Sequence, residues 1–192
     1  MTDDPRALVA RARLGDQDAF AQLAQPDWPR LYRLCLRFVG DPGRAEDLAQ
    51  EALTRAWLRL PQLRDDTAFT PWLLQMAANL AKNELRRRRE EPWPEEGIEL
   101  PAQGQEADGR LLLGEQRRRI DEALGRLPAL QRVAVELVLR DELGYREAAG
   151  ILGVPLGTLK TLVHRGRARL RAALSEEADE LRGGAVDAKP DY

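Results

Sequence analysis

The chain has 192 residues and a net charge of −2, with 32% charged and 5% aromatic residues. That length can bury one sizeable core or two small ones, and the composition is typical of helix-rich soluble proteins. A single cysteine (Cys35) and a single histidine (His164) exclude an internal disulfide and argue against a zinc site. Because no signal-peptide run or stretch near the roughly 20 apolar residues of a membrane span occurs, we expect a cytoplasmic protein without membrane insertion.

The first half, residues 1–89, shows apolar residues at helical spacing almost throughout. This spacing predicts short helices around Gly15 and then a helix that ends at Gly40. Asp41 and Pro42 form a helix start, an N-cap followed by a first-turn proline. One face of that helix is an apolar stripe: Ala45, Leu48, Ala49, Ala52, Leu53, Ala56, Trp57 and Leu60. It therefore packs against a core.

A polar loop follows Pro61 and leads into the last helix of this half. Thr70 and Pro71 again resemble an N-cap and a first helical residue, although a start one turn earlier, at Thr67, is also compatible with the pattern. The buried face of this helix is predicted to contain Trp72, Leu73, Met76, Ala77, Leu80 and Ala81. The helix ends in the four arginines at 86–89.

The helix after Asp41 carries a second face opposite its apolar stripe. Its members are Asp47, Gln50, Glu51, Thr54, Arg55 and Leu58. We expect Asp47 and Glu51 not to pair with bases four residues on, and an exposed leucine among acids fits a docking surface for a basic partner. An ordinary solvated face is the other interpretation that the spacing permits.

The helix that ends in arginines carries amides beside cations near its end: Asn79, Lys82, Asn83, Arg86 and Arg87. Residues 79–89 hold five bases and one acid, a net charge of +4. Amides beside cations suit hydrogen bonding to bases and phosphates together. A solvated helix end and a basic targeting tag are the competing interpretations.

Residues 90–110 change character. Positions 90–109 hold seven acidic side chains, three prolines and no basic residue. So little apolar surface does not offset the entropy of ordering the chain. We therefore expect a flexible acidic linker.

Residues 111–174 form a second helical block, and residues 175–192 an expected disordered tail. Within the block, "YREAAGILG", the connector "VPLG" and the basic "TLKTLVHRGRARLRAAL" match a helix-turn-helix pattern. From Thr158, the expected N-cap, to Arg171 the chain has five Lys/Arg and no acid, as a phosphate binder would. An amphipathic helix with a solvated basic face remains the alternative. The overall prediction is all-α: two small helical domains joined by the linker, the second a helix-turn-helix domain.

Taken together, these segments resemble a known family. "AEDLAQEALTRAWLRL" followed by "AFTPWLLQMAANLAKNELRRRR" is similar to the core-binding and promoter-melting helices of bacterial sigma factors. "LPALQRVAVELVLRDELGYREAAGILGVPLGTLKTLVHRGRARLRAAL" is similar to their promoter-reading C-terminal domain. Since no third domain separates them, the match is to the two-domain extracytoplasmic-function (ECF) group.

The resemblance implies a role for each surface. The surface that docks on core RNA polymerase corresponds to Asp47, Gln50, Glu51 and Arg55. In the family, a base-capturing loop and a strand-holding face contact the minus-ten promoter element. They correspond here to Leu63, Arg64, Asp65, Asp66, Thr67, Asn79, Lys82, Asn83, Arg86 and Arg87. The helix that contacts the minus-thirty-five element in the family corresponds to Thr158, Lys160, Thr161, His164, Arg165 and Arg167.

The same resemblance implies that the acidic linker threads the polymerase where nucleic acid would otherwise lie. Two residues depart from the family pattern. Leu162 stands where an arginine is usual, which removes a contact worth roughly 1–3 kcal/mol. Pro71 is also unusual, and it bears on the geometry of the loop before it.

The implied function is that of a sigma factor, with core RNA polymerase and promoter DNA as partners and an anti-sigma factor as a further one. The rival from another class is a free-standing helix-turn-helix regulator, which would need neither the acidic face nor the arginine helix. An enzyme has little support, because one histidine, one cysteine and no Gly-rich phosphate loop assemble no catalytic set. We expect no cofactor and no metal.

Overall fold

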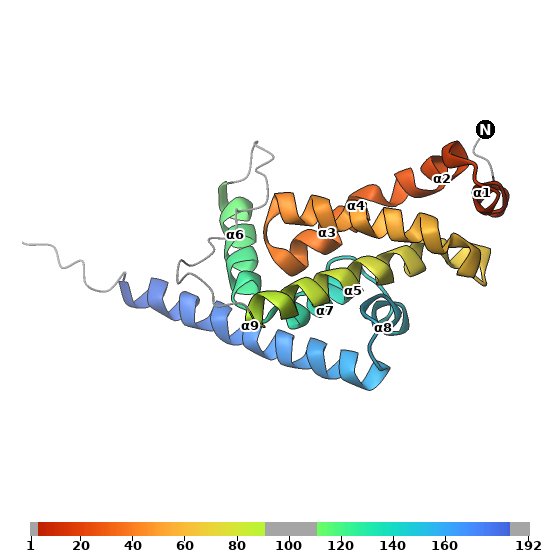
Figure 1. Cartoon of the computed structure of the whole chain (residues 1–192). Helices are drawn as coiled ribbons and strands as arrows, with labels where there is room; N and C mark the ends of the chain where they lie inside the picture. The colour runs from red at the N-terminus through yellow and green to blue at the C-terminus, as the bar shows by residue number, and fades with distance from the viewer. Residues whose placement is uncertain (1–3, 91–110, 185–192) are drawn as a thin grey trace, which may run out of the picture.

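The computed structural model describes residues 4–90 and 111–184. These residues form two helical units, drawn from red to yellow-green and from green to blue in Figure 1. The first unit consists of α1 (Pro5–Arg13), α2 (Gln17–Ala24), α3 (Trp28–Val39), α4 (Pro42–Arg59) and α5 (Phe69–Glu90), with 3-10 turns at Gln25–Asp27, Leu60–Gln62 and Asp66–Ala68. The second consists of α6 (Leu111–Gly125), α7 (Ala129–Leu139), α8 (Tyr145–Leu152) and α9 (Leu156–Gly184).

Local sequence explains where the helices of the first unit begin and end. The carboxylate of Asp41 accepts from the Arg44 amide at 2.7 Å and so caps α4, with Pro42 as its first residue. Gly40 ends α3 in the left-handed region, at φ 71°, where a side chain would be strained. Both ends were predicted from the sequence, and both are confirmed.

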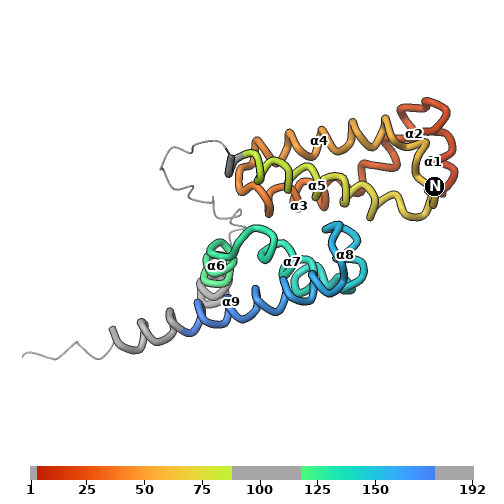
Figure 2. Tube along the Cα trace, turned by 60° about the horizontal axis from the view of Figure 1, so that its bottom comes forward, coloured from red at the N-terminus to blue at the C-terminus, as the bar shows by residue number. Residues whose placement is uncertain are grey.

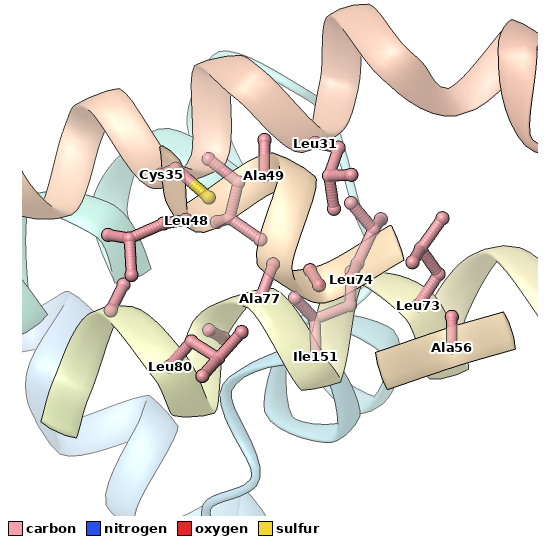
Figure 3. Close-up of a cluster of buried hydrophobic side chains, with 14 of the residues drawn as sticks. Leu31, Cys35, Leu48, Ala49, Ala56, Leu73, Leu74, Ala77, Leu80 and Ile151 are labelled. Atoms are coloured by element: carbon pink, nitrogen blue, oxygen red, sulfur yellow. The ribbon is translucent and has the colours of Figure 1, made fainter. Parts of the chain in front are cut away.

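The apolar faces pack as their periodicity predicts. Of the predicted α4 stripe, Leu53 and Trp57 are half-buried and the other members are buried. On α5, Leu73, Ala77, Leu80 and Ala81 are buried, while Trp72 and Met76 pack at the edge of the core. Figure 3 shows Leu73, Ala77 and Leu80 of α5 in one cluster with labelled side chains of α3 and α4.

The two units pack on one another. Figure 2 shows α3, α4 and α5 as one layer above α7, α8 and α9. One continuous cluster of buried side chains runs through both units, and Ile151 of α8 lies beside Leu74 of α5 in Figure 3. The sequence predicted the units themselves but not this shared core.

Three boundaries differ from the predictions. Helix α5 begins at Phe69 after a 3-10 turn, and Thr70 is not its cap: its hydroxyl donates to Asp27 Oδ2 at 2.6 Å. Helix α9 begins at Leu156, so Thr158 lies inside its first turn and does not cap it. The α9 helix also continues to Gly184, where an irregular tail had been expected after residue 174. The predicted linker lies outside the described residues, apart from Glu90 at the end of α5.

Candidate functional site

The acidic face of α4 is exposed along its length. Asp47, Gln50, Glu51, Arg55 and Leu58 all face solvent, and Leu58 is 70% exposed. Glu51 was expected to be unpaired, but this is wrong, because Arg55 stands four residues on and its Nη2 lies 2.5 Å from Glu51 Oε1. An exposed i,i+4 pair of this kind stabilises a helix by only about 0.3–0.5 kcal/mol. The face therefore combines exposed charged side chains with one apolar side chain, Leu58, that does not pack in the core.

The loop between α4 and α5 is held by its own side chains. Asp65 accepts from the Thr67 amide at 2.9 Å and from its hydroxyl at 2.6 Å, and these hydrogen bonds lower the pKa of Asp65. Arg13 of α1 pairs with Asp66 at 2.7 Å and also donates to the Leu63 carbonyl. The turn is thus rigidly tied to α1.

Within this loop the predicted minus-ten residues divide into two groups. Arg64, Asp65 and Thr67 are exposed, and Asp66 is half-exposed. Leu63, which the resemblance implied as a DNA contact, has its side chain buried at 6% exposure. Leu63 belongs to the apolar core and its carbonyl accepts from Arg13 of α1, so its side chain supports the loop and does not face a ligand.

The strand-holding face predicted on α5 is split in the same way. Asn79, Asn83, Arg86 and Arg87 are exposed, and Arg87 pairs with Glu84 at 3.2 Å. Lys82 is only half-exposed, and its Nζ donates to the Leu152 carbonyl of the second unit at 2.6 Å. Burial lowers the pKa of Lys82, as expected for an ammonium that has lost water. The centre of this face therefore touches helix α8.

The predicted minus-thirty-five residues lie together on the outer face of α9. Its members are exposed: Thr158, Lys160, Thr161, His164, Arg165 and Arg167. Leu159, Val163 and Gly166 recur at helical spacing and are buried on the inner face. Leu162 is half-buried and packs against the core, so the residue that departs from the family pattern is turned partly inward.

One residue at this face was missed by the sequence reasoning. Tyr145, the first residue of α8, joins Lys160, His164, Arg167 and Arg171 around a surface hollow of about 470 Å³. A hollow lined by a phenol and several cations suits a phosphate backbone or a base edge. The signal was present as an exposed aromatic residue at the start of the first helix-turn-helix helix.

Comparison with known proteins assigns the class. Residues 27–91 match the family model of sigma-70 region 2, and residues 117–170 match that of sigma-70 region 4. The first match holds α3, α4 and α5, and the second holds the helix-turn-helix. The class of protein is therefore that of the sigma-70 transcription initiation factors, which is not a class of enzymes.

Full-length relatives narrow the class. The chain is 32% identical over 178 residues to the ECF RNA polymerase sigma factor SigW of Bacillus subtilis, covering 88% of this chain and 95% of the relative. It is 33% identical over 172 residues to the ECF RNA polymerase sigma-E factor of Escherichia coli, covering 84% and 90%. The chain belongs to the ECF family of RNA polymerase sigma factors, which direct polymerase to promoters. This match does not favour the free-standing regulator.

Solved structures agree with the fold. The sigma factor RpoE of Bartonella quintana, in complex with the anti-sigma factor NepR, superposes with a TM-score of 0.63 at 28% identity, covering 81% of this chain and 96% of that one. CnrH, in complex with the cytosolic domain of CnrY, has the same fold, with a TM-score of 0.62 at 24% identity and covering 90% and 99%. No helix among the described residues is both long and apolar enough to cross a membrane.

Proposed function

We propose that this sigma factor divides its work among the three surfaces described above. Residues 1–89 bind core RNA polymerase and melt the minus-ten element, residues 90–110 link the domains, and residues 111–174 read the minus-thirty-five element. Polymerase docks on Asp47, Gln50, Glu51 and Arg55 of α4. The minus-ten strand is held by the exposed loop residues and by the α5 face, and duplex DNA meets the outer face of α9.

The observation that carries this proposal is the separation of charge among exposed faces. On the docking face of α4 two acids, Asp47 and Glu51, face outward beside one base, Arg55, whereas the residues assigned to DNA that face outward on α5 and α9 include amides and cations and no acid. Cationic faces attract phosphates, and an acidic face repels them and suits a basic protein surface. The chain acts through binding and carries out no reaction, so it needs no cofactor. Its place of action is the cytoplasm, where bacterial polymerase works.

A further partner is an anti-sigma factor. The RpoE structure that this chain resembles holds the anti-sigma factor NepR. We propose that a comparable anti-sigma factor binds and regulates this chain. Co-purification of the untagged chain with a protein from its own host tests this part.

Charge reversal on α4 tests the polymerase surface. Asp47→Lys with Glu51→Lys should weaken binding to purified bacterial core polymerase by about a hundredfold or more, because like charges facing across an interface cost several kcal/mol. The matched control is Glu122→Lys with Glu142→Lys, the same change of charge on exposed acids of the second unit. Titration by fluorescence anisotropy gives both dissociation constants. Equal affinity of the two double variants would refute the assignment of α4.

A further inference from the structure

The loop between α4 and α5 is built from two separate turns. In the first, the Leu63 amide donates to the Leu60 carbonyl at 3.1 Å. In the second, the Ala68 amide donates to the Asp65 carbonyl at 3.0 Å. Within the described residues no backbone hydrogen bond links one turn to the other. Arg64 lies between the two turns, so its position depends on what holds them together.

One side chain of α1 provides that link. Arg13 Nη2 donates to the Leu63 carbonyl of the first turn and lies 2.7 Å from Asp66 Oδ1 of the second. Its Nε lies 3.5 Å from the Leu60 carbonyl oxygen. A guanidinium holds its N–H groups in a rigid plane, so acceptors bound to it keep fixed positions relative to one another. The separation of the two turns is therefore set by Arg13.

This link is partly shielded from water. The side chains of Arg13 and Asp66 are 29% and 30% exposed, so salt screens the pair less than it screens a fully exposed one. Among the described residues no backbone amide donates to the Leu63 carbonyl across the loop, and Arg13 supplies a donor instead. The same guanidinium therefore satisfies a backbone group and neutralises a carboxylate.

Helix α1 is a fixed support for Arg13. Leu8, Val9 and Ala12 are buried at no more than 7% exposure and anchor the helix in the core. Figures 1 and 2 both show α1 at the end of the first unit that carries the loop between α4 and α5. The helix lies outside residues 27–91, which match sigma-70 region 2, so that match assigns it no role.

The contacts within the loop decide which of its side chains remain for a ligand. The Asp65 carboxylate accepts from Thr67, and Asp66 pairs with Arg13. Arg64 is exposed, and no hydrogen bond or ion pair with another described residue engages it. A guanidinium binds a base through paired hydrogen bonds, which require close alignment. The loop therefore offers one cation whose direction depends on the turns on either side of it.

We propose that Arg13 is a positioning residue for minus-ten recognition: it joins the two turns of the loop and so fixes the direction in which Arg64 meets the captured base. This rests on the proposed function of the loop. Arg13 is bonded to the loop backbone and acts through Arg64. It affects discrimination between bases and leaves docking on polymerase unchanged, because the docking residues lie on α4.

The value of one base contact sets the size of the effect. A well-placed pair of hydrogen bonds favours the right base over a wrong one by about five- to 150-fold. Without Arg13 the separation of the two turns varies, and Arg64 samples directions that do not fit the base. The preference at the bases that the loop reads should therefore fall about fivefold or more.

Three substitutions on α1 form the test. Arg13→Ala removes the link between the turns. Arg13→Lys keeps the charge but has no planar fork, so it should restore only part of the preference. The matched control is Arg11→Ala, which removes another arginine of α1 and its 2.8 Å ion pair with Asp16. All three variants should bind core polymerase as tightly as the wild type in fluorescence anisotropy, since the α4 face is unchanged.

The readout is the base preference of the assembled holoenzyme. The full-length chain with bacterial core polymerase selects from a pool of short single-stranded DNA with a randomised segment, and the bound fraction is sequenced against core polymerase alone. Arg64→Ala identifies the positions that the loop reads, because the preference changes there. At these positions Arg13→Ala should lose about fivefold or more of the preference, and Arg11→Ala should match the wild type. Other positions should not change in either variant.

Either of two results would overturn the role of Arg13. One is an unchanged preference in Arg13→Ala. The other is a loss that is equal at every position or equally large in Arg11→Ala, as a general loosening of the fold would cause. Failure of the proposed function has a different sign: if Arg64→Ala changes no position, the loop does not read the strand, and the role of Arg13 falls with it.

Discussion

Cys35 illustrates how strongly this fold changes the chemistry of one residue. The thiol is buried at 0% exposure among the apolar side chains of α3, α4 and α5, and burial raises its pKa to about 12. The thiolate is the reactive form, and an unfolded cysteine has a pKa of about 8.5. At pH 8 the folded thiol therefore stays protonated as well as shielded.

Alkylation kinetics test this. With iodoacetamide at pH 8, Cys35 in the native chain should react at least ~100-fold more slowly than in urea-unfolded chain, because a raised pKa removes the thiolate and burial removes access. Intact-mass spectrometry follows the reaction. The variant Gln22→Cys supplies an exposed thiol as an internal control. Equal rates at the two cysteines would contradict the burial.

For single residues, the sequence predicts the chemical role of a side chain better than it predicts whether that side chain is exposed to solvent. The amides and cations of the α5 face could be read from spacing, and Asn83 and Arg86 do point outward. Leu63 and Lys82 could not be placed in the same way. Whether a loop leucine turns inward, or a lysine meets another helix, depends on elements distant in the chain, here α1 and α8.

At the scale of the element, the close approach of α9 to α7 depends on Gly166. A Cβ at that position would lie 2.5 Å from Val135 Cγ2 and 3.4 Å from the Gln131 carbonyl oxygen. Val135 is branched at Cβ and only 2% exposed, so it has little room to move. The glycine inside this helix is thus required for packing, which outweighs its unfavourable helix propensity.

Gly166→Ala should therefore destabilise the chain. Overpacking costs about 1–3 kcal/mol, against about 0.5–1 kcal/mol gained from helix propensity, so we expect a net loss of roughly 0.5–2 kcal/mol in urea unfolding. Gly150→Ala is the control, because a Cβ there meets nothing within 4 Å and α8 should become more stable. Gly166→Ala as stable as wild type would show that α7 and α9 can move apart.

Element boundaries were less predictable than element faces. The stripes on α4 and α9 follow from period 3.6, which many residues specify together. The start of α9 depends on a few residues: the chain enters the helix directly after Pro155, and Gly153 makes the turn alone, at φ 61°. Thr158 is a residue type that often caps helices, but it lies inside the first turn of α9, which begins at Leu156.

At the scale of the whole molecule, the units share one core, so they should not unfold separately. Calorimetry of the wild-type chain should give one transition whose calorimetric and van't Hoff enthalpies agree. Asp141→Lys removes the two hydrogen bonds, at 2.5 and 2.8 Å, that Arg37 of α3 donates to the Asp141 carboxylate in the second unit, and it should divide this single transition into two. Two well-separated transitions in the wild type would instead indicate independent units.

This interface was beyond the reach of sequence reasoning. In "WPRLYRLCLRFVG", Arg37 lies off the apolar face and reads as a solvated cation. Its carboxylate partner stands 104 residues away, in a unit that the pattern treats as a separate domain. An ion pair between residues so far apart produces no periodic pattern in the sequence, because each partner is a single residue in its own segment.

The exposure of the cationic outer face of α9 has a consequence for competition inside a cell. A genome offers about 10⁶–10⁹ non-specific sites, and an exposed cationic face binds to their phosphates even on a chain whose net charge is −2. Copies held at such sites are not available to polymerase. The number of copies needed to compete with other initiation factors is correspondingly higher.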